Sequence, residues 1–326
     1  MPTSLGNLPF IDLYVCLEKT EKAYFRSKDR TQSIASQFVP PEYQDVINRF
    51  VDAINLKLQE KNDGALTFDG IRCRLARQQV SDGSHWVCAR RIETEIPDID
   101  KLNLPPVIVN HMKGLGRRDG LIVISGATGH GKTTTAVALL EHYLKNYGGT
   151  AVTIEDPCEY IMAGRHGTSG QCFQIEVMEE EDWAICLKRT LRWSPRYIFV
   201  GEIRTPKAAE QLLRAASTGH LVITTVHSGT MEEALMGIIF LAEQSMGSGV
   251  YNMLASGLTA LVNQTLGDSK PNLKYLFTEE NNNGDPVRTL IREAKTGMLA
   301  TYIDRTAARL QAGALQNGSV TGGKKT

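Results

Sequence analysis

The residues best suited to chemistry form one glycine-rich segment, GATGHGKTT at 126–134. It satisfies the pattern GxxxxGK[ST], in which glycines bring backbone N–H groups close to bound phosphates. In that pattern Lys132 contacts the β- and γ-phosphates and the Thr133 hydroxyl coordinates Mg²⁺. The segment predicts binding of a nucleoside triphosphate with Mg²⁺. The residues expected to bind it are Gly126, Ala127, Thr128, Gly129, His130, Gly131, Lys132, Thr133 and Thr134.

Acidic and histidine residues lie at the ends of three other aliphatic runs. They are Glu155, Asp156 and Glu159 after residues 151–154, Glu202 after 197–200, and His220 and His227 on either side of 221–226. Hydrolysis of a Mg²⁺-bound triphosphate needs one carboxylate for the metal and one to take a proton from water. Glu202 is predicted in the first role and Glu159 or Glu155 in the second. Structural roles are the alternative: a turn or helix cap for Asp156, a C-capping position for His220.

A parallel sheet is needed to bring these residues together. The runs 121–125, 150–154, 197–200 and 221–226 are aliphatic without alternation, which is typical of strands buried on both faces. A helix-like segment precedes each run, and the helix after the glycine-rich loop has apolar residues on one face. We expect a doubly wound α/β domain, in which functional groups collect at the carboxyl ends of the strands.

The first third of the chain has a different pattern. A strand is predicted at 10–16, a helix at about 41–61, and alternating strands at 65–68, 71–76 and 86–91. This pattern indicates an α+β domain with an antiparallel sheet. Pro105 and Pro106 force an extended chain that ends the preceding element of secondary structure. We therefore expect domains at 1–105 and 106–326.

Composition excludes several classes of protein. The 326 residues include 36 Lys plus Arg and 36 Asp plus Glu, so no basic excess favours nucleic-acid binding. No apolar run is long enough to span a membrane, and MPTSLGNLPF lacks the order of a secretory signal. Six well-separated cysteines indicate reduced thiols. A cytoplasmic protein is expected.

Four segments in order resemble the conserved boxes of the type II and type IV secretion ATPases. GATGHGKTTT at 126–135 is similar to the Walker A box, TIEDPCEY at 153–160 to the Asp box, GEIR at 201–204 to Walker B, and STGHLVITTVHS at 217–228 to the His box. The segment VRTLIRE at 287–293 resembles the signature helix of the PilT-like branch, the type IV pilus retraction ATPases. FIDLYV, IRCRLARQQ and LVNQTL also look like family segments.

The resemblance implies a homo-hexameric ring ATPase. Each subunit would have a PAS-like N-terminal domain and a RecA-like C-terminal domain, with ATP and Mg²⁺ bound between neighbouring subunits. Hydrolysis would power type IV pilus retraction or a related type IV secretion or conjugation machine. The ring would lie in the cytoplasm and reach the bacterial inner membrane only through a platform protein.

By matching position, the resemblance also assigns roles to single residues. Glu159 falls on the general base, Glu202 on the Walker B carboxylate, and His220 and His227 on the pair that senses nucleotide state. Arg74 and Arg91 are the best matches to arginines that reach the nucleotide from the N-terminal domain. The alternatives for this role are Arg90 and Arg118.

Two other functions share the ATPase core. A RecA-like or helicase-like nucleic-acid motor is disfavoured by zero net charge, by the lack of basic clusters interleaved with aromatics, and by the His box. A small-molecule kinase would need a lid and an acceptor site, for which the sequence has no signal.

The sequence departs from the family pattern at a few positions. Ser194 and Arg196 stand where the segment before Walker B is usually acidic, and Thr205 stands in place of Asp after GEIR. An arginine expected before the Walker A strand falls on Asp119, with Arg118 beside it. These changes leave the predicted chemistry intact but weaken the assignment to pilus retraction proper.

The C-terminal segment predicts a helix that packs one face on the core. Val287, Leu290, Ile291 and Ala294 recur at helical spacing, with Asp285 as the N-cap. The opposite face would present Arg288, Arg292 and Glu293. By the resemblance, that face transmits ATP-driven motion.

Overall fold

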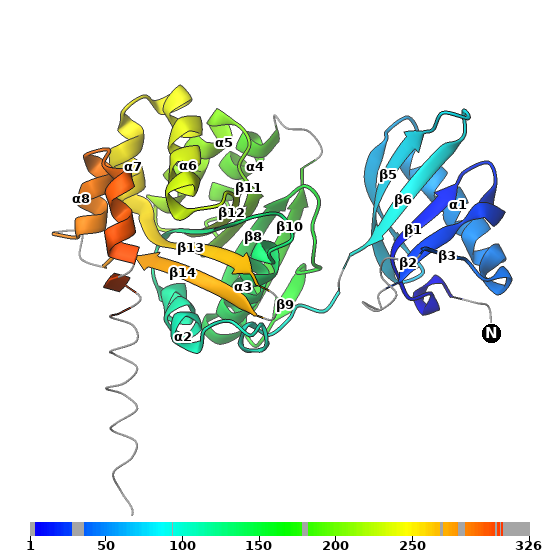
Figure 1. Cartoon of the computed structure of the whole chain (residues 1–326), viewed down its shortest axis with the longest axis horizontal. Helices are drawn as coiled ribbons and strands as arrows, with labels where there is room; N and C mark the ends of the chain where they lie inside the picture. The colour runs from blue at the N-terminus through cyan, green and yellow to red at the C-terminus, as the bar shows by residue number, and fades with distance from the viewer. Residues whose placement is uncertain are drawn as a thin grey trace, which may run out of the picture. The chain divides into compact units, whose positions relative to one another are not determined.

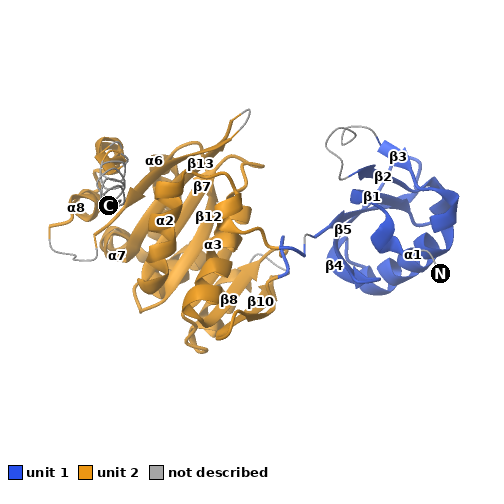
Figure 2. Cartoon of the chain, turned by 90° about the horizontal axis from the view of Figure 1, so that it is seen from below, with its two compact units in different colours: residues 1–95, 159–161 blue, residues 96–158, 162–326 orange. Residues whose placement is uncertain are grey.

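The computed structural model describes residues 4–27, 36–92, 94–177, 182–267, 270–279, 284–303, 305, 306 and 308. The chain divides into two compact units, one of residues 1–95 with 159–161, the other of 96–158 with 162–326 (Figure 2). The second unit therefore begins ten residues before the expected boundary at 105/106. The reason is that the short helix η4 (Ile99–Lys101) packs on two helices of that unit.

The first unit is a six-stranded antiparallel sheet with one long helix, which confirms the predicted α+β pattern but includes two strands, at 24–27 and 36–38, that the sequence did not predict. The strand order is β3-β2-β1-β6-β5-β4. The helix α1 (Gln44–Leu58) buries Val46, Ile47, Phe50, Val51, Ile54 and Leu58 in the core of this unit. The strands are β1 (Phe10–Cys16), β2 (Tyr24–Ser27), β3 (Ser36–Phe38), β4 (Asp63–Phe68), β5 (Ile71–Gln79) and β6 (His85–Arg91).

The second unit is built on an eight-stranded mixed sheet in the order β14-β13-β7-β12-β11-β8-β10-β9. The six strands from β13 to β10 run parallel, and β14 and β9 pair antiparallel at the two edges. The strands are β7 (Gly120–Gly126), β8 (Gly149–Glu155), β9 (Gly164–His166), β10 (Gly170–Glu176), β11 (Tyr197–Glu202), β12 (Leu221–His227), β13 (Leu258–Leu266) and β14 (Pro271–Phe277).

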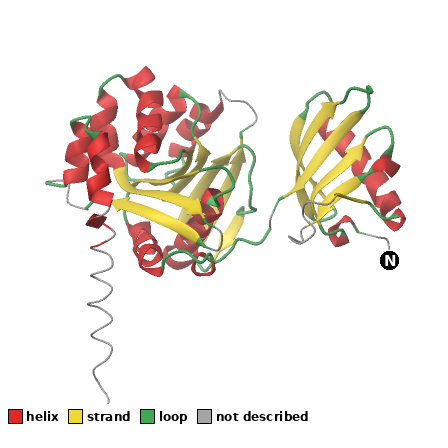
Figure 3. Cartoon of the chain, in the orientation of Figure 1, coloured by secondary structure: helices red, strands yellow, loops and turns green. Residues whose placement is uncertain are grey.

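Helices cover both faces of this sheet, which confirms the predicted doubly wound architecture (Figure 3). Figure 1 shows α2 and α3 on one face and α4 to α7 on the other. The helices are α2 (Pro106–Gly114), α3 (Lys132–Tyr147), α4 (Asp182–Leu191), α5 (Pro206–Ala216), α6 (Met231–Met246), α7 (Gly249–Gly257) and α8 (Pro286–Arg292). Among the described residues, no helix is long and apolar enough to cross a membrane.

The four aliphatic runs form adjacent strands at the centre of the sheet. They are β7, β12, β11 and β8, and their main bodies are almost entirely inaccessible to solvent. Parallel pairing brings the carboxyl ends of all four to one edge. That edge carries the glycine-rich loop.

Candidate functional site

The glycine-rich loop joins the end of β7 to the start of α3. Gly126 closes the strand with a φ of 154°, and Gly131 precedes the helix with a φ of 78°. A Cβ on Gly126 would lie 2.2 Å from the main-chain oxygen of Gln264, so no larger residue fits there. Thr133 and Thr134 are half-buried in the first turn of α3. The loop thus places backbone amides and a helix N-terminus together, which is the arrangement that binds phosphate.

Lys132 is folded into this loop. Its side chain is 5% exposed, and its ammonium lies 3.0 Å from the carbonyl oxygen of Ala127 and 3.2 Å from Nδ1 of His227. The same imidazole nitrogen lies 3.3 Å from the Thr128 hydroxyl. His227 ends β12 and is in register with Gly126 of β7. The structure therefore brings together three of the predicted residues, the lysine, the threonine and the second histidine.

Two of the predicted carboxylates end the next two strands of the sheet. Glu202 ends β11, with its side chain 27% exposed, and Glu155 ends β8, where it is buried. Gln174 donates a hydrogen bond to Glu155 from 3.2 Å. The four strand ends side by side therefore supply a phosphate loop, a histidine and two carboxylates.

Arg204 links two acidic residues at this edge. It donates a hydrogen bond to Glu202, and one of its nitrogens lies 3.6 Å from a carboxylate oxygen of Asp156. Asp156 precedes Pro157 through a cis peptide bond. The GEIR segment contains Arg204, but the sequence pattern assigned no role to this residue. Its position two residues after Glu202 is the signal that could have indicated one.

Glu159, Arg74 and Arg91 belong to the first unit. Glu159 is exposed and clusters there with residues 160–161. Arg74 on β5 is also exposed, whereas Arg91 on β6 lies over the ring of Phe10, 5.5 Å from its centroid. Their roles in the reaction stay predictions.

The pairing of β5 with β6 constrains how these arginines can act. Arg91 pairs with Cys73, and Arg74 pairs with Arg90. Because successive side chains alternate between the faces of a sheet, Arg74 and Arg91 lie on opposite faces, and Arg90 shares the face of Arg74. Arg90 donates a hydrogen bond of 2.7 Å to a carboxylate oxygen of fully buried Asp12. This hydrogen bond raises the pKa of Arg90.

His220 lies at the other end of its strand from His227. His220 and His227 are seven positions apart along β12, which corresponds to about 20 Å at the usual rise of a strand. Its ring nitrogen lies 2.6 Å from the carbonyl oxygen of Pro195. The two histidines are therefore not brought together within one chain, because both flank a single extended strand.

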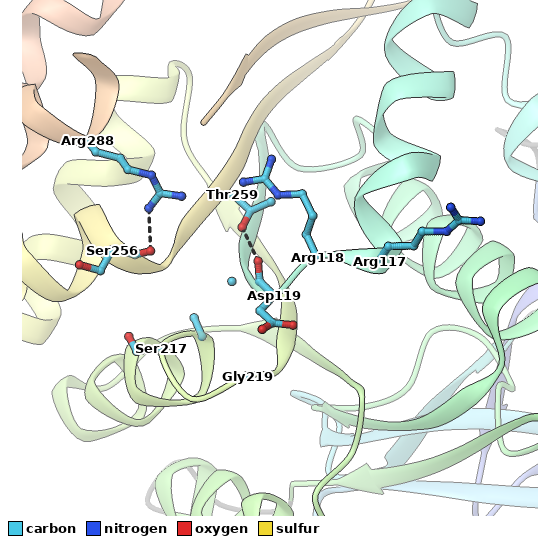
Figure 4. Close-up of a pocket in the computed structure, with 10 residues that line it drawn as sticks. Arg117, Arg118, Asp119, Ser217, Gly219, Ser256, Thr259 and Arg288 are labelled. Carbon is cyan, nitrogen blue, oxygen red and sulfur yellow. Dashed lines mark hydrogen bonds between the residues drawn. The ribbon is translucent and has the colours of Figure 1, made fainter. Parts of the chain in front are cut away.

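A cavity of about 500 Å³ lies at this amino end of the parallel strands, away from the glycine-rich loop (Figure 4). Arg117, Arg118, Asp119 and Arg288 contribute charged side chains to its lining. Arg118 also donates a hydrogen bond of 2.8 Å to the carbonyl oxygen of Thr278. This cavity is thus distinct from the predicted nucleotide site.

Two of the departures from the family pattern lie together beside this cavity. Arg196 forms an ion pair of 2.5 Å with Asp119 and donates a second hydrogen bond to the carbonyl oxygen of Arg118. A position expected to be acidic and one expected to be basic have exchanged charge. The two departures thus compensate each other.

Arg288 does not lie on the face of its helix where the sequence predicted it. The helical spacing predicted it on the outer face of its helix, but the residue is 4% exposed. It donates hydrogen bonds to the carbonyl oxygens of Ala255 and Ser256, near the end of α7, and to the hydroxyl of Thr278. Arg292 and Glu293 are exposed as predicted. Ala294, predicted on the packed face, is exposed because α8 ends at Arg292.

The chain is similar to known proteins over most of its length. Residues 70–296 match the family model described as type II/IV secretion system protein. The type IV pilus ATPase PilU of Pseudomonas aeruginosa is 37% identical over 180 residues, which cover 54% of this chain and 45% of PilU. The uncharacterized protein YggR of Escherichia coli is 29% identical over 302 residues, covering 90% and 88% of the two chains. Unlike YggR, PilU and two further relatives are matched over only about half of their own length.

Solved structures have the same fold. The pilus retraction motor PilT with bound ADP superposes with a TM-score of 0.70 at 28% identity, covering 90% of this chain and 85% of PilT. The ATPase DotB of Legionella pneumophila gives a TM-score of 0.69 at 22% identity, covering 94% of this chain and 85% of DotB, a likeness of fold alone. These similarities confirm the expected RecA-like ATPase fold. The smaller α+β unit precedes it in the chain, and its PAS-like character stays a prediction.

Proposed function

Because the chain belongs to the type II/IV secretion system protein family, we propose that it is an ATP-hydrolysing motor. Its work would be retraction of a type IV pilus or the drive of a related type IV secretion or conjugation machine. The similarity to PilU and to the retraction motor PilT supports the pilus assignment. The observation that carries the proposal is the glycine-rich loop with buried Lys132, beside two strand-end carboxylates.

The loop residues would bind the phosphates of ATP. The loop leads directly into α3, so its amides and the N-terminus of that helix would face one site, and the ammonium of Lys132 would add a positive charge there. Lys132 now contacts the Ala127 carbonyl and His227. A bound phosphate would replace these neutral partners of the ammonium with an anionic one, and a hydrogen bond between opposite charges is stronger.

Mg²⁺ fits the donors at this edge of the sheet. Thr133 and Glu202 would supply oxygen ligands, because Mg²⁺ usually takes one or two protein ligands and completes its shell with phosphate and water. No group of three or more His, Cys, Asp or Glu side chains that could hold a metal by itself occurs in the described part of the chain. When bound, Mg²⁺ would neutralise charge that develops on the phosphates. Glu159, or Glu155 in its place, would take the proton from the attacking water.

The motor would act as a homo-hexamer with ATP between neighbouring subunits. Because Arg74 and Arg91 lie on opposite faces of the sheet of the first unit, one of the two would then reach the nucleotide of the next subunit and stabilise the transition state. The ring would work at the cytoplasmic side of the inner membrane, held there only by a platform protein. Nucleic acid is not expected as a partner, because the chain has no net positive charge.

Lys132→Ala tests the proposal directly. The variant should fold, because the lysine contacts polar loop atoms, but it should lose ATP hydrolysis and bind ATP at least tenfold more weakly. Lys207→Ala removes an exposed lysine at the start of α5 and is the matched control. ATP binding near wild-type affinity in the Lys132 variant would rule out the phosphate-loop assignment. Stimulation of the wild-type rate by single-stranded DNA would favour a nucleic-acid motor instead.

A further inference from the structure

Gln264 contacts the glycine-rich loop from the neighbouring strand. It lies on β13, next to β7 in the sheet, and is 3% exposed. Its side-chain amide nitrogen donates to the carbonyl oxygen of His130 from 2.7 Å. Its amide oxygen accepts from the hydroxyl of Thr135 at 2.8 Å. Both ends of one buried amide are therefore used on the loop and on the first turn of α3.

The first of these hydrogen bonds sets the direction of a backbone amide. In a trans peptide the C=O and the following N–H point in opposite directions. Because the carbonyl of His130 points at Gln264, the N–H of Gly131 points away from β13. Gly131 is one of the loop residues whose amide is predicted to face phosphate.

Gln264 also constrains the two glycines that bound the loop. A Cβ on Gly131 would lie 3.1 Å from the side-chain nitrogen of Gln264, and one on Gly126 would lie 2.2 Å from its main-chain oxygen. β13 and β7 are held together by their parallel backbone pairing, and the side chain next to Gln264 adds to it. Asn263 donates to the Ser125 hydroxyl from 3.1 Å, and that hydroxyl donates to the Val262 carbonyl oxygen.

We propose that Gln264 is a positioning residue for the phosphates of the nucleotide. It fixes the His130–Gly131 peptide and the first turn of α3 in the orientation that presents amides to the ligand, without touching the ligand itself. This inference rests on the proposed ATP-binding function. Since the loop contacts phosphate both before and during hydrolysis, losing the clamp would weaken binding more than it slows turnover.

Gln264→Met tests this, because it keeps the length of the side chain and removes both hydrogen bonds. Calorimetric titration with a non-hydrolysable ATP analogue should show affinity about tenfold weaker than wild type, the effect of one to two hydrogen bonds. The KM for ATP should rise by a similar factor while kcat changes less than about threefold. Thr135→Val removes one of the two bonds and should weaken binding about threefold. The double variant should show less than the product of the two effects, since both act through one contact.

Thr278→Val is the matched control for a purely structural effect. Thr278 is fully buried and donates a hydrogen bond to the Leu258 carbonyl oxygen, at the opposite end of β13. Thr278→Val should lower the melting temperature and leave nucleotide affinity unchanged. If Gln264→Met loses stability as Thr278→Val does but binds the analogue like wild type, the positioning role is wrong. Should Gln264→Met fail to fold, unchanged affinity in Thr135→Val overturns the proposal. A wild-type chain that binds no nucleotide would instead refute the proposed function itself.

Discussion

Three glutamates are candidates for two chemical tasks at the proposed nucleotide site. Glu202 is partly exposed at the end of β11, and Glu155 is buried beside it with Gln174 as a partner. Glu159 is exposed and four residues further along the chain. A carboxylate that holds a metal and one that takes a proton respond differently to loss of charge, so substitution can separate them.

Glu202→Gln should bind ATP and lower kcat by at least about a hundredfold, because the amide keeps the shape but loses the charge that a metal ligand needs. Glu159→Gln should have a similar effect if Glu159 is the general base. Pre-steady-state hydrolysis together with analogue binding gives both readings. An unchanged kcat in Glu159→Gln would transfer the base role to Glu155, and Glu155→Gln would then have to lose turnover.

Between elements, the Asp119–Arg196 ion pair joins the segment before β7 to the segment before β11. The two side chains are 54% and 32% exposed, so the pair contributes modestly to stability. Asp119→Arg and Arg196→Asp should each lower the free energy of unfolding by about 0.5–1 kcal/mol, since each places like charges together. The double exchange should recover most of that loss in chemical denaturation. Additive losses in the double variant would show that the two charges do not interact.

The two arginines of the seven-residue helix α8, Arg288 and Arg292, should have different effects on stability when replaced. Arg288 holds carbonyls near the end of α7, so Arg288→Ala should cost about 2–3 kcal/mol of stability by leaving those acceptors without a donor. Arg292 is exposed, and Arg292→Ala should leave stability and ATPase activity near wild type. The check is thermal unfolding of both variants beside their ATPase rates.

Only Arg292→Ala therefore tests whether α8 transmits motion. Loss of pilus retraction or secretion with normal ATPase would support transmission through its exposed face. Normal cellular output in that variant would remove the role from Arg292. The Arg288 variant cannot answer this question if it loses stability as expected.

Across the whole molecule, local patterns predicted what depends on neighbours in sequence. Aliphatic runs marked β7, β8, β11 and β12, and the loop motif marked its own strand and helix. The clamp by Gln264 joins residues about 130 positions apart, and no local pattern signals such a pairing. The burial of Arg288 was missed for a related reason. A charged residue beside an apolar stripe is buried only when distant carbonyls are there to receive it.

The proposed function requires a homo-hexameric ring of these chains. Arg74 and Arg91 lie in the first unit, and the phosphate loop lies in the second. If arginines reach the nucleotide of a neighbouring subunit, hydrolysis requires assembly. Dissociated subunits would then bind ATP and hydrolyse it slowly.

The most direct test is specific ATPase activity measured across a dilution series, with sedimentation velocity on the same samples. The proposal predicts that activity per subunit rises with protein concentration in parallel with a hexameric species. Adding the Lys132→Ala variant to the wild type should lower activity by more than its share of the subunits. Activity per subunit that stays constant down to concentrations where the protein sediments as a monomer would contradict the proposed ring motor.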